Sequence, residues 1–393
     1  ARMASIMCRA TTMGVHMQTD IMAGMQPDSG AAPAGGWVVR GPQFTVCVMA
    51  NVFCFLDNGK ASLNAVMGKL RELGLSALAG LTLFALAAWG LTLGSFRLPL
   101  TEILQALRGA GSKDADFIIM NLRLPRVLVA LMVGPLLAMS GALFQGLVRN
   151  PLVSPDIMGI NAGATLVAVF WIVTRQPHGL LPLAAFLGAL GAAALIYLLT
   201  WRGRISGARL ILVGIGINAL LTAGTTWLII RYPVNQVTAA VLWTAGSVYG
   251  SDWADVRLLA LALALLAPLA IGLMWALGVL QYGDEAARSL GMPLERTRLA
   301  LMLVGCALSG VAVSVAGPVG FVAFMLPHLA RMLAGPLPGG VLLFTGLLGG
   351  ILVLGADLVG QHALPVSLPV GVVTAALGAP YFLFLLYRTN ARM

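Results

Sequence analysis

From residue 75 onward, the chain alternates long apolar runs with short polar segments. The runs are apolar at every position rather than at alternate positions, which indicates helices and not half-buried strands. A helix of about 20 apolar residues spans the hydrocarbon core of a bilayer. We therefore predict ten transmembrane helices, at residues 75–94, 124–147, 160–174, 180–200, 210–230, 257–280, 299–315, 318–334, 340–359 and 368–387.

The composition supports this prediction. Hydrophobic residues make up 59% of the chain and charged residues only 10%, with a mean hydropathy of +0.92, whereas soluble domains carry about 25% charged residues. A chain this poor in charge cannot cover itself with a wetted surface. Lipid requires every backbone polar group to be paired within the protein, which leaves helices or closed barrels. The continuous apolar runs decide for an all-α, polytopic membrane protein.

Residues 1–66 differ from the rest of the chain. They hold three of the four cysteines and many scattered methionines, without a periodic apolar face, and Pro27–Gly36 is typical of coil. A signal peptide would need a basic start, an apolar core and a small-residue cleavage site in that order, and they do not follow one another here. We predict a poorly structured extension over 1–66 and a membrane domain over 67–393. Our hypothesis is that Met67 is the natural start; a genuine disordered tail is the alternative.

The distribution of basic residues orients the predicted bundle. The chain carries 24 Lys and Arg against 14 Asp and Glu, a formal net charge of +10. An even number of spans places both ends of the membrane domain on one side. If that side is the cytoplasm, the inner loops hold more basic residues than the outer ones, with the loop Trp201-Arg-Gly-Arg204 as the clearest anchor. The positive charge thus predicts cytoplasmic loops rather than contacts to nucleic acid.

The sequence lacks the motifs of metal binding, disulfide frameworks and nucleotide binding. The cysteines Cys8, Cys47, Cys54 and Cys306 form no CxxC pair and no Cys/His cluster, so neither a metal site nor a disulfide framework is predicted. Cys306 lies in an apolar span, where we expect it to fill space. The nucleotide-binding pattern GxxxxGK[ST] does not occur. If the protein works with ATP, a partner chain must bind it, and we expect no cofactor on this one.

Two arginines mark the outer mouth of the second span, in Arg123-Leu-Pro-Arg126. They lie one helical turn apart and so point the same way, and Pro125 suits a first turn. Such a pair can dock acidic side chains of an external partner. Arginines that merely reach for the interface would look the same, so the residues alone leave both interpretations open.

The most charged stretch of the membrane domain is Tyr282-Gly-Asp-Glu-Ala-Ala-Arg288-Ser-Leu-Gly-Met-Pro-Leu-Glu295-Arg-Thr-Arg298, on the predicted cytoplasmic side. It predicts a short helix, a turn at Gly291 and Pro293, and the start of another helix. A solvated loop needs no such turn, whereas a rigid projection against which a partner can push does. We favour a coupling surface.

Three polar residues fall inside predicted spans: Asp357, His328 and Asn218. An acid within the membrane is a candidate for proton transfer or ion binding. Asp357 has no second acid for a relay and lies near the outer end, before Gln361 and His362, so we favour a structural or interfacial role. His328 follows Pro327 and is expected to be packed and hydrogen-bonded.

At this point the residues resemble a known family, the iron–siderophore and vitamin B12 permeases of ABC importers, with the pattern of ferric enterobactin permease subunits. The resemblance covers about residues 75–388, in order. Its motifs are Arg123-Leu-Pro-Arg126, Ser140-Gly-Ala-Leu-Phe-Gln-Gly146, Arg149-Asn-Pro-Leu152, Pro155-Asp-Ile-Met-Gly159, Asn161-Ala-Gly-Ala164, Ala287-Arg-Ser-Leu-Gly291, Ala316-Gly-Pro-Val-Gly-Phe321, Pro327-His-Leu-Ala-Arg331, Ala356-Asp357 and Leu368-Pro-Val-Gly-Val-Val-Thr-Ala375.

The resemblance implies a type II ABC importer permease of ten transmembrane helices in the bacterial inner (cytoplasmic) membrane, with both ends inside. It implies ATPase subunits that bind ATP and Mg, a second permease subunit and a periplasmic siderophore-binding protein as partners. A pattern closer to heteromeric pairs favours a paralogous second permease over a second copy of this chain.

The resemblance also assigns candidate site residues. It implies that an ATPase coupling loop is formed by Asp284, Glu285, Ala287, Arg288, Ser289, Leu290, Gly291, Met292, Pro293, Glu295 and Arg296. Docking of the binding protein falls to Arg123, Arg126 and the position of Gln361, where many relatives carry an arginine, so the neutral glutamine puts that contact in doubt. The fifth span would line the pathway, with Leu210, Asn218 and Thr222.

Other functions compete with an iron–siderophore permease. A vitamin B12 or haem-type permease belongs to the same family. A proton-coupled secondary transporter would want several intramembrane acids or histidines. An intramembrane serine protease would use Ser140 and His328, but Ala138-Met139 departs from the expected glycine pattern.

Overall fold

The structure is a computed structural model that describes residues 68–94, 96, 98–201, 207–335, 340–363 and 365–390. Within these residues every regular element is a helix. By its internal contacts the chain divides into two units, Ala1–Leu70 and Arg71–Met393. All the helices discussed below belong to the second unit, apart from the first residues of the first helix. The expectations for residues 1–66 and for a natural start at Met67 lie outside the described residues.

The described residues contain seven helices that are long and apolar enough to cross a membrane. Their bounds are Gly68–Thr92, α5 (Leu124–Val148), which continues a helical stretch from Lys113, α7 (Leu181–Thr200), α8 (Gly207–Arg231), α10 (Trp253–Leu280), α12 (Leu294–Ala316) and α14 (Gly340–His362). Three more apolar stretches are shorter, namely α6 (Ile160–Val173), α13 (Val322–Ala334) and the part Val370–Leu385 of α15 (Val370–Asn390).

These helices coincide with the predicted spans to within about four residues, except that the first helix begins seven residues and α12 five residues before the predicted start, so the all-α membrane fold is confirmed. The number of ten crossings stays a prediction, because α6 and α13 are shorter than a bilayer requires. The pattern missed small elements outside the spans. They are α3 (Leu100–Leu107), α4 (Lys113–Phe117), the π-helix η1 (Ile118–Arg123), the 3₁₀ helix η2 (His178–Leu180) and α9 (Val234–Thr244).

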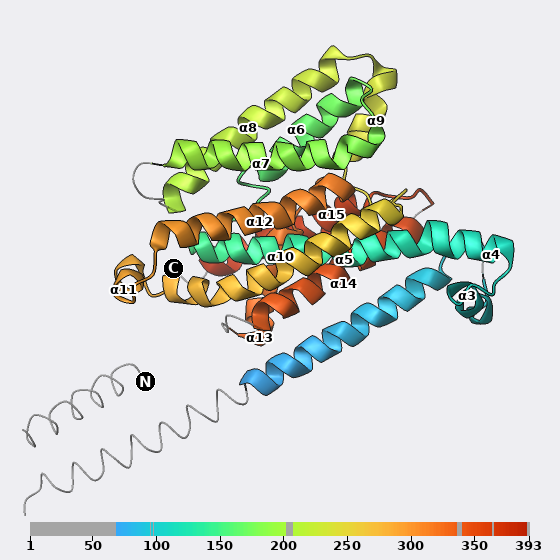
Figure 1. Ribbon diagram of the computed structural model, residues 1–393, viewed down its shortest axis with the longest axis horizontal. Helices are drawn as coiled ribbons and strands as arrows, with labels where there is room; N and C mark the ends of the chain where they lie inside the picture. The colour runs from blue at the N-terminus through green and yellow to red at the C-terminus, as the bar shows by residue number, and fades with distance from the viewer. Residues whose placement is uncertain are drawn as a thin grey trace, which may run out of the picture. The chain divides into compact units, whose positions relative to one another are not determined.

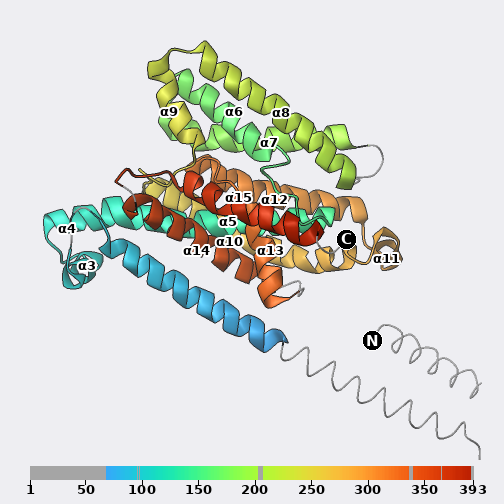
Figure 2. The ribbon, with the colours of Figure 1, turned by 180° about the vertical axis from the view of Figure 1, so that it is seen from behind.

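The helix α5 forms the centre of the bundle and contacts α10, α12, α13 and α14 (Figures 1 and 2). It is apolar on all sides, as expected of a helix that is surrounded by others, and Leu136, Leu137 and Leu143 have no exposed surface. Gly134 of α5 meets Gly349 of α14 with almost no gap, since a Cβ added at Gly134 would lie 2.1 Å from the Gly349 carbonyl oxygen. Small residues permit this close approach.

The helices α6, α7, α8 and α9 form a second group (Figure 1). Gly163 of α6 and Gly188 of α7 are the close-contact pair here, because a Cβ on either one would lie 2.5 Å from the carbonyl oxygen of the other. This group is tied to the α5 bundle through α12, where the Ser309 hydroxyl donates to the Asn161 side chain at 2.7 Å.

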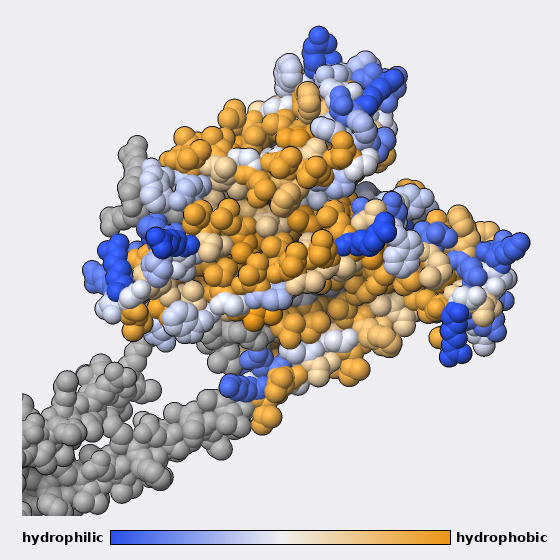
Figure 3. Space-filling view, in the orientation of Figure 1, coloured by the Kyte–Doolittle hydropathy of each residue, from blue (hydrophilic) through white to orange (hydrophobic). Residues whose placement is uncertain are grey.

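The surface of the bundle is largely apolar. Figure 3 shows a broad apolar band over the helices, with hydrophilic residues gathered towards their ends. Large exposed side chains such as Leu212, Leu220 and Leu265 are more than half accessible. Soluble monomers rarely expose apolar patches beyond a few hundred Å², so this surface belongs in lipid and the chain is a multi-pass membrane protein.

Candidate functional site

Residues 282–298, predicted to form a coupling surface and called the coupling segment below, have the predicted order of helix, turn and helix. The helix α11 (Asp284–Ser289) ends in a turn where Gly291 has φ 76°, a left-handed conformation that favours glycine. The helix α12 then begins at Leu294, directly after Pro293. Helix, turn and helix follow one another within a dozen residues, so the segment projects as a compact unit at the junction of α10 and α12.

Ion pairs fix the base of this segment. Arg149 and Arg298 each donate to the carboxylate of Asp284 at 2.8 Å, and Arg298 also bonds Glu295 at 3.3 Å. Arg149 caps the end of α5, so Asp284 connects α5, α11 and α12. Burial alone would raise the pKa of Asp284, but the hydrogen bonds and charges of Arg298 and then Arg149 outweigh it and lower the pKa below its ordinary value.

The segment divides into a buried side and an exposed side. Ala287, Met292 and Leu294 are buried and pack into the core. The exposed side consists of Glu285, Arg288, Ser289, Leu290, Gly291, Pro293 and Arg296. Leu290 is 70% exposed at the tip. A rigid projection that presents a large apolar side chain beside charges is suited to contact another protein.

At the opposite end of the bundle, both predicted docking arginines have partners within the chain. Arg123 donates to the carbonyl oxygens of Leu91 at 2.8 Å and Phe96 at 2.6 Å, which lie at the end of the first helix and in the loop after it. Arg126 donates twice to Asp357, at 3.0 and 2.7 Å. Their docking role stays a prediction, and the structure adds that each also holds helices together.

Asp357 is the centre of a polar network with Arg126 and Gln361, which we call the outer network because this end of the bundle is predicted to face outward. Gln361 donates to it at 2.7 Å, one helical turn further along α14, and the ring of Tyr249 lies 5.2 Å from the Arg126 guanidinium carbon, a cation–π contact. Asp357 therefore has a charge partner and a structural position, as we favoured. The neutral Gln361 serves as its second donor.

The predicted pathway residues have different surroundings along α8. Leu210 is 1% exposed and packs in the core, while Thr222 is exposed. Asn218 is partly buried against Gly159, where a Cβ would lie 2.9 Å from the Asn218 backbone nitrogen. Of the three, Thr222 lies on the open face of α8.

Two polar networks in the bundle were not anticipated. Asp156 accepts from the Asn161 side chain, which in turn accepts from Ser309. Gln145 donates to the Phe324 carbonyl at 2.9 Å and accepts from Arg331. Their bonds Asn161–Ser309 and Gln145–Arg331 join residues 148 and 186 positions apart, so no local pattern indicates them.

The residues of a protease are not arranged for catalysis. Ser140 is fully buried and its hydroxyl donates to the Gly305 carbonyl at 2.6 Å, so it is inaccessible to a substrate. His328 lies with its ring 6.3 Å from that of Tyr381. Cys306 is buried in the core, as expected. The described residues contain no cluster of His, Cys, Asp and Glu that could hold a metal ion.

Comparison with known proteins identifies similar sequences over most of the chain. The family model of the FecCD transport family matches residues 81–388, and a family of uncharacterized conserved proteins matches residues 1–72. A probable siderophore transport system permease protein of Bacillus subtilis is 41% identical over 307 residues, 76% of this chain and 90% of its own. The ferric enterobactin transport system permease protein of Escherichia coli is 40% identical over 306 residues, 77% of this chain and 92% of its own.

A solved structure shares the fold. It is described as an inward-facing conformation of a transporter of the metal-chelate ABC type, is 28% identical, and superposes with a TM-score of 0.73 over 80% of this chain and 99% of its own. The similarity covers the membrane domain as a whole rather than any one motif.

Proposed function

The chain belongs to the FecCD transport family, and on that premise we propose that it is the permease subunit of an ABC importer that moves iron–siderophore complexes from the periplasm to the cytoplasm. Siderophore and iron-chelate permeases recur among its relatives at about 40% identity. The permease provides the passage, and ATP hydrolysis belongs to a separate subunit. The chain is therefore not an enzyme.

The strongest structural support for this proposal comes from the coupling segment. Asp284 fixes its base through two arginines, while Arg288, Leu290 and Arg296 lie on its exposed side. A projection that is rigid at its base and exposed at its tip can transmit a displacement from a partner into α5, α11 and α12. We propose that the tip seats against an ATPase subunit, which binds ATP and Mg.

The proposed cycle is alternating access. ATP closes the ATPase pair, the coupling segment moves with it, and the helices around the pathway rock between outward and inward openings. The helix α8 would line the pathway together with a second permease subunit, a paralogue rather than a second copy. The exposed face of α8 carries Leu212, Ile215 and Thr226, and between Arg209 and Arg231, near the two ends of the helix, α8 has no charged residue. Such a surface holds cargo weakly, so selectivity would rest with a periplasmic binding protein.

The outer network would receive that binding protein. Arg126, Asp357 and Gln361 lie at the end of the bundle opposite the coupling segment. In the proposed orientation this end faces the periplasm, and both ends of the membrane domain lie in the cytoplasm. Arg123 and Arg126 would accept acidic side chains of the binding protein in addition to their partners within the chain.

Reconstituted uptake tests the proposal. The chain is inserted into vesicles with its second permease and ATPase subunits, and uptake of a radiolabelled ferric siderophore is measured with its binding protein outside. We expect uptake to require the ATPase subunit and ATP enclosed in the vesicles, on the side of the membrane where the ATPase subunit lies. An uncoupler should not reduce this uptake. Uptake by the permease alone, or uptake that an uncoupler abolishes while ATP is present, would contradict the proposal and favour a proton-coupled transporter.

A further inference from the structure

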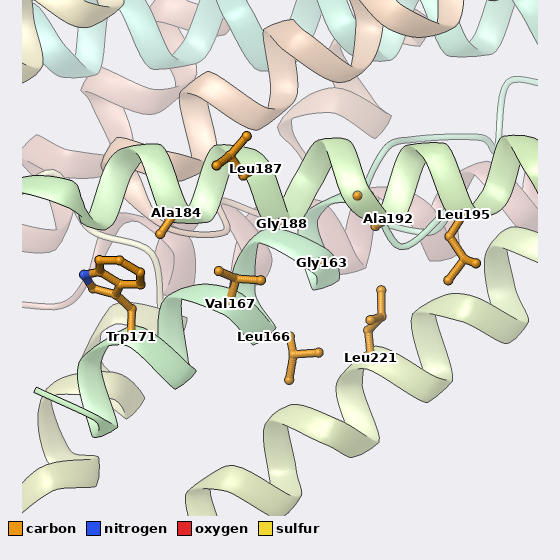
Figure 4. A pocket seen from close by; sticks show the side chains of 11 residues that line it. Gly163, Leu166, Val167, Trp171, Ala184, Leu187, Gly188, Ala192, Leu195 and Leu221 are labelled. Atoms are coloured by element: carbon orange, nitrogen blue, oxygen red, sulfur yellow. The ribbon is translucent and has the colours of Figure 1, made fainter. Parts of the chain in front are cut away.

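A narrow apolar groove runs between α6, α7 and α8, with a volume of about 440 Å³. Figure 4 shows its lining side chains. The α7 residues that line the groove recur at every helical turn from Ala184 to Leu195. At a rise of 1.5 Å per residue, this part of α7 is about 16 Å long. That length is about half of the 30 Å hydrocarbon core, the depth of one leaflet.

The lining is apolar throughout. The floor consists of Gly163, Gly188 and Ala192, where α6 and α7 approach closely, and four leucines and Val167 form the walls. Trp171 brings the one polar group, and its indole N–H already donates to the Pro177 carbonyl at 3.0 Å. A polar or charged cargo would find no hydrogen-bond partner here and would lose its hydration.

The dimensions exclude a helix as the occupant. A helix about 10 Å across and 16 Å long takes up about 1,300 Å³, roughly three times the volume of the groove. A second protein copy could cover the opening but could not fill it. A single extended hydrocarbon chain has the required width.

The surroundings of the groove agree with a lipid. Its rim at Leu187 and Leu195 continues into the exposed leucines of α7, such as Leu183 and Leu198, which are part of the apolar band. Trp171 lies at one end of the groove, and tryptophan is enriched at the level of the lipid headgroups. One turn beyond it, Arg175 is exposed and forms no ion pair with any residue that the structure describes.

We propose that the groove between α6, α7 and α8 binds one acyl chain of a phospholipid whose phosphate lies against Arg175. The apolar walls hold the chain, and the guanidinium supplies a charge-assisted hydrogen bond to the phosphate. The leaflet is the one at the α6–α7 connection, the outer leaflet in the proposed orientation. This inference requires only that the chain is embedded in a membrane and is independent of the cargo.

Gly191 offers a sharp test of the groove. It lines the groove, and a Cβ added there meets no atom within 4 Å. Gly191→Leu therefore adds its Cβ without a clash and places the rest of the side chain at the groove. Gly272 of α10 is also exposed with nothing within 4 Å, so Gly272→Leu is a matched control that adds the same side chain elsewhere on the lipid-facing surface.

The full chain is reconstituted in phospholipid vesicles with trace phosphatidylglycerol that carries a diazirine in the middle of one acyl chain. After illumination, labelled peptides are quantified by mass spectrometry. We expect residues 163–195 to be labelled about five-fold more than the lipid-facing helix α10, the ratio for a site that binds about 1 kcal/mol more tightly than bulk lipid. Gly191→Leu should abolish the excess, Arg175→Gln should reduce it, and Gly272→Leu should leave it unchanged.

Three results would overturn the proposal. Labelling of residues 163–195 at the level of α10 would show ordinary boundary lipid. An excess that persists in Gly191→Leu would show that the bound lipid does not occupy the groove. Efficient disulfide formation between two copies of Gly191→Cys in the membrane, together with no excess label, would show that a second copy of the chain covers the groove.

Discussion

Asp357 accepts two hydrogen bonds from Arg126 and thereby ties α14 to the first turn of α5. The carboxylate side chain is only 3% exposed and the arginine side chain 16%. Each of the two side chains can therefore keep its charge in a buried position only because the other neutralises it. The pair explains why an acid lies in an otherwise apolar span, without any proton transfer.

Removing one member of this pair should destabilise the fold strongly. In Arg126→Met, Asp357 keeps its charge in a buried position without its main partner, a change that costs about 3–5 kcal/mol when a buried pair is broken. We expect a lower unfolding midpoint in detergent. Arg231→Met, at the exposed end of α8, should have little effect.

A double-mutant cycle separates the interaction free energy of Arg126 and Asp357 from the effect of each substitution alone. Arg126→Met with Asp357→Leu removes both charges, so the double variant should be more stable than Arg126→Met alone. The coupling free energy should exceed about 1 kcal/mol, the range for residues in one network. Effects that simply add would mean that Arg126 and Asp357 do not depend on each other.

The close contact of α5 and α14 predicts a contrast between two glycines of one helix. A Cβ at Gly349 would lie 2.3 Å from the Gly134 carbonyl oxygen, whereas a Cβ at Gly355 meets nothing within 4 Å. Gly349→Ala should separate the helices and cost about 1–3 kcal/mol or more. Gly355→Ala should be neutral or slightly stabilising, because alanine favours a helix. Equal thermal unfolding midpoints for the two variants would contradict this packing.

The sequence predicted what depends on local pattern. Continuous apolar runs located the helices, and the Gly291 and Pro293 turn gave the shape of the coupling segment. Asp357 and Arg126 were each singled out, yet their pairing was not, because they lie 231 positions apart and a pattern along the chain carries no information on such contacts. The same reason hid the Asn161–Ser309 bond. The helix α9 was missed because it is short and lies outside the long apolar runs.

The ion pairs of Asp284 predict a particular dependence on pH. Its pKa is lowered from 3.8 in the fold because the arginines outweigh the effect of burial. A group with a depressed folded pKa stabilises the fold above its unfolded pKa and loses that contribution as the pH falls through the folded value. The stability difference between wild type and Asp284→Asn should therefore stay constant from about pH 8 to about pH 5 and shrink below about pH 4.

The measurement is equilibrium unfolding at a series of pH values. Glu285→Gln is the control, since Glu285 is exposed on the same helix and lies next to Asp284. If the difference for Asp284→Asn already declined near neutral pH, the arginines would not hold its carboxylate in the ionised form.

Charge reversal on the exposed side of the coupling segment should separate transport from folding. Arg288 is exposed on α11, so Arg288→Glu should leave membrane insertion and the unfolding midpoint unchanged. It should abolish siderophore uptake, and it should weaken assembly with the ATPase subunit in pull-down experiments. Arg257→Glu, exposed at the start of α10 at the other end of the bundle, should retain assembly. Full uptake by Arg288→Glu would refute the coupling role.

A substitution in the outer network should strengthen, rather than weaken, the binding of the periplasmic binding protein. Gln361 donates to Asp357 beside Arg126, so Gln361→Arg places a second guanidinium next to the same carboxylate. One carboxylate can neutralise only one of the two positive charges, and the outer face gains a net positive charge that an acidic binding protein would meet. Its affinity for the assembled importer should rise at low salt, and the gain should vanish at high salt because exposed charges are screened. Gln361→Met, which adds no charge, should not raise the affinity. A gain that persists at high salt would mean that contacts other than charge dominate docking at this end of the bundle.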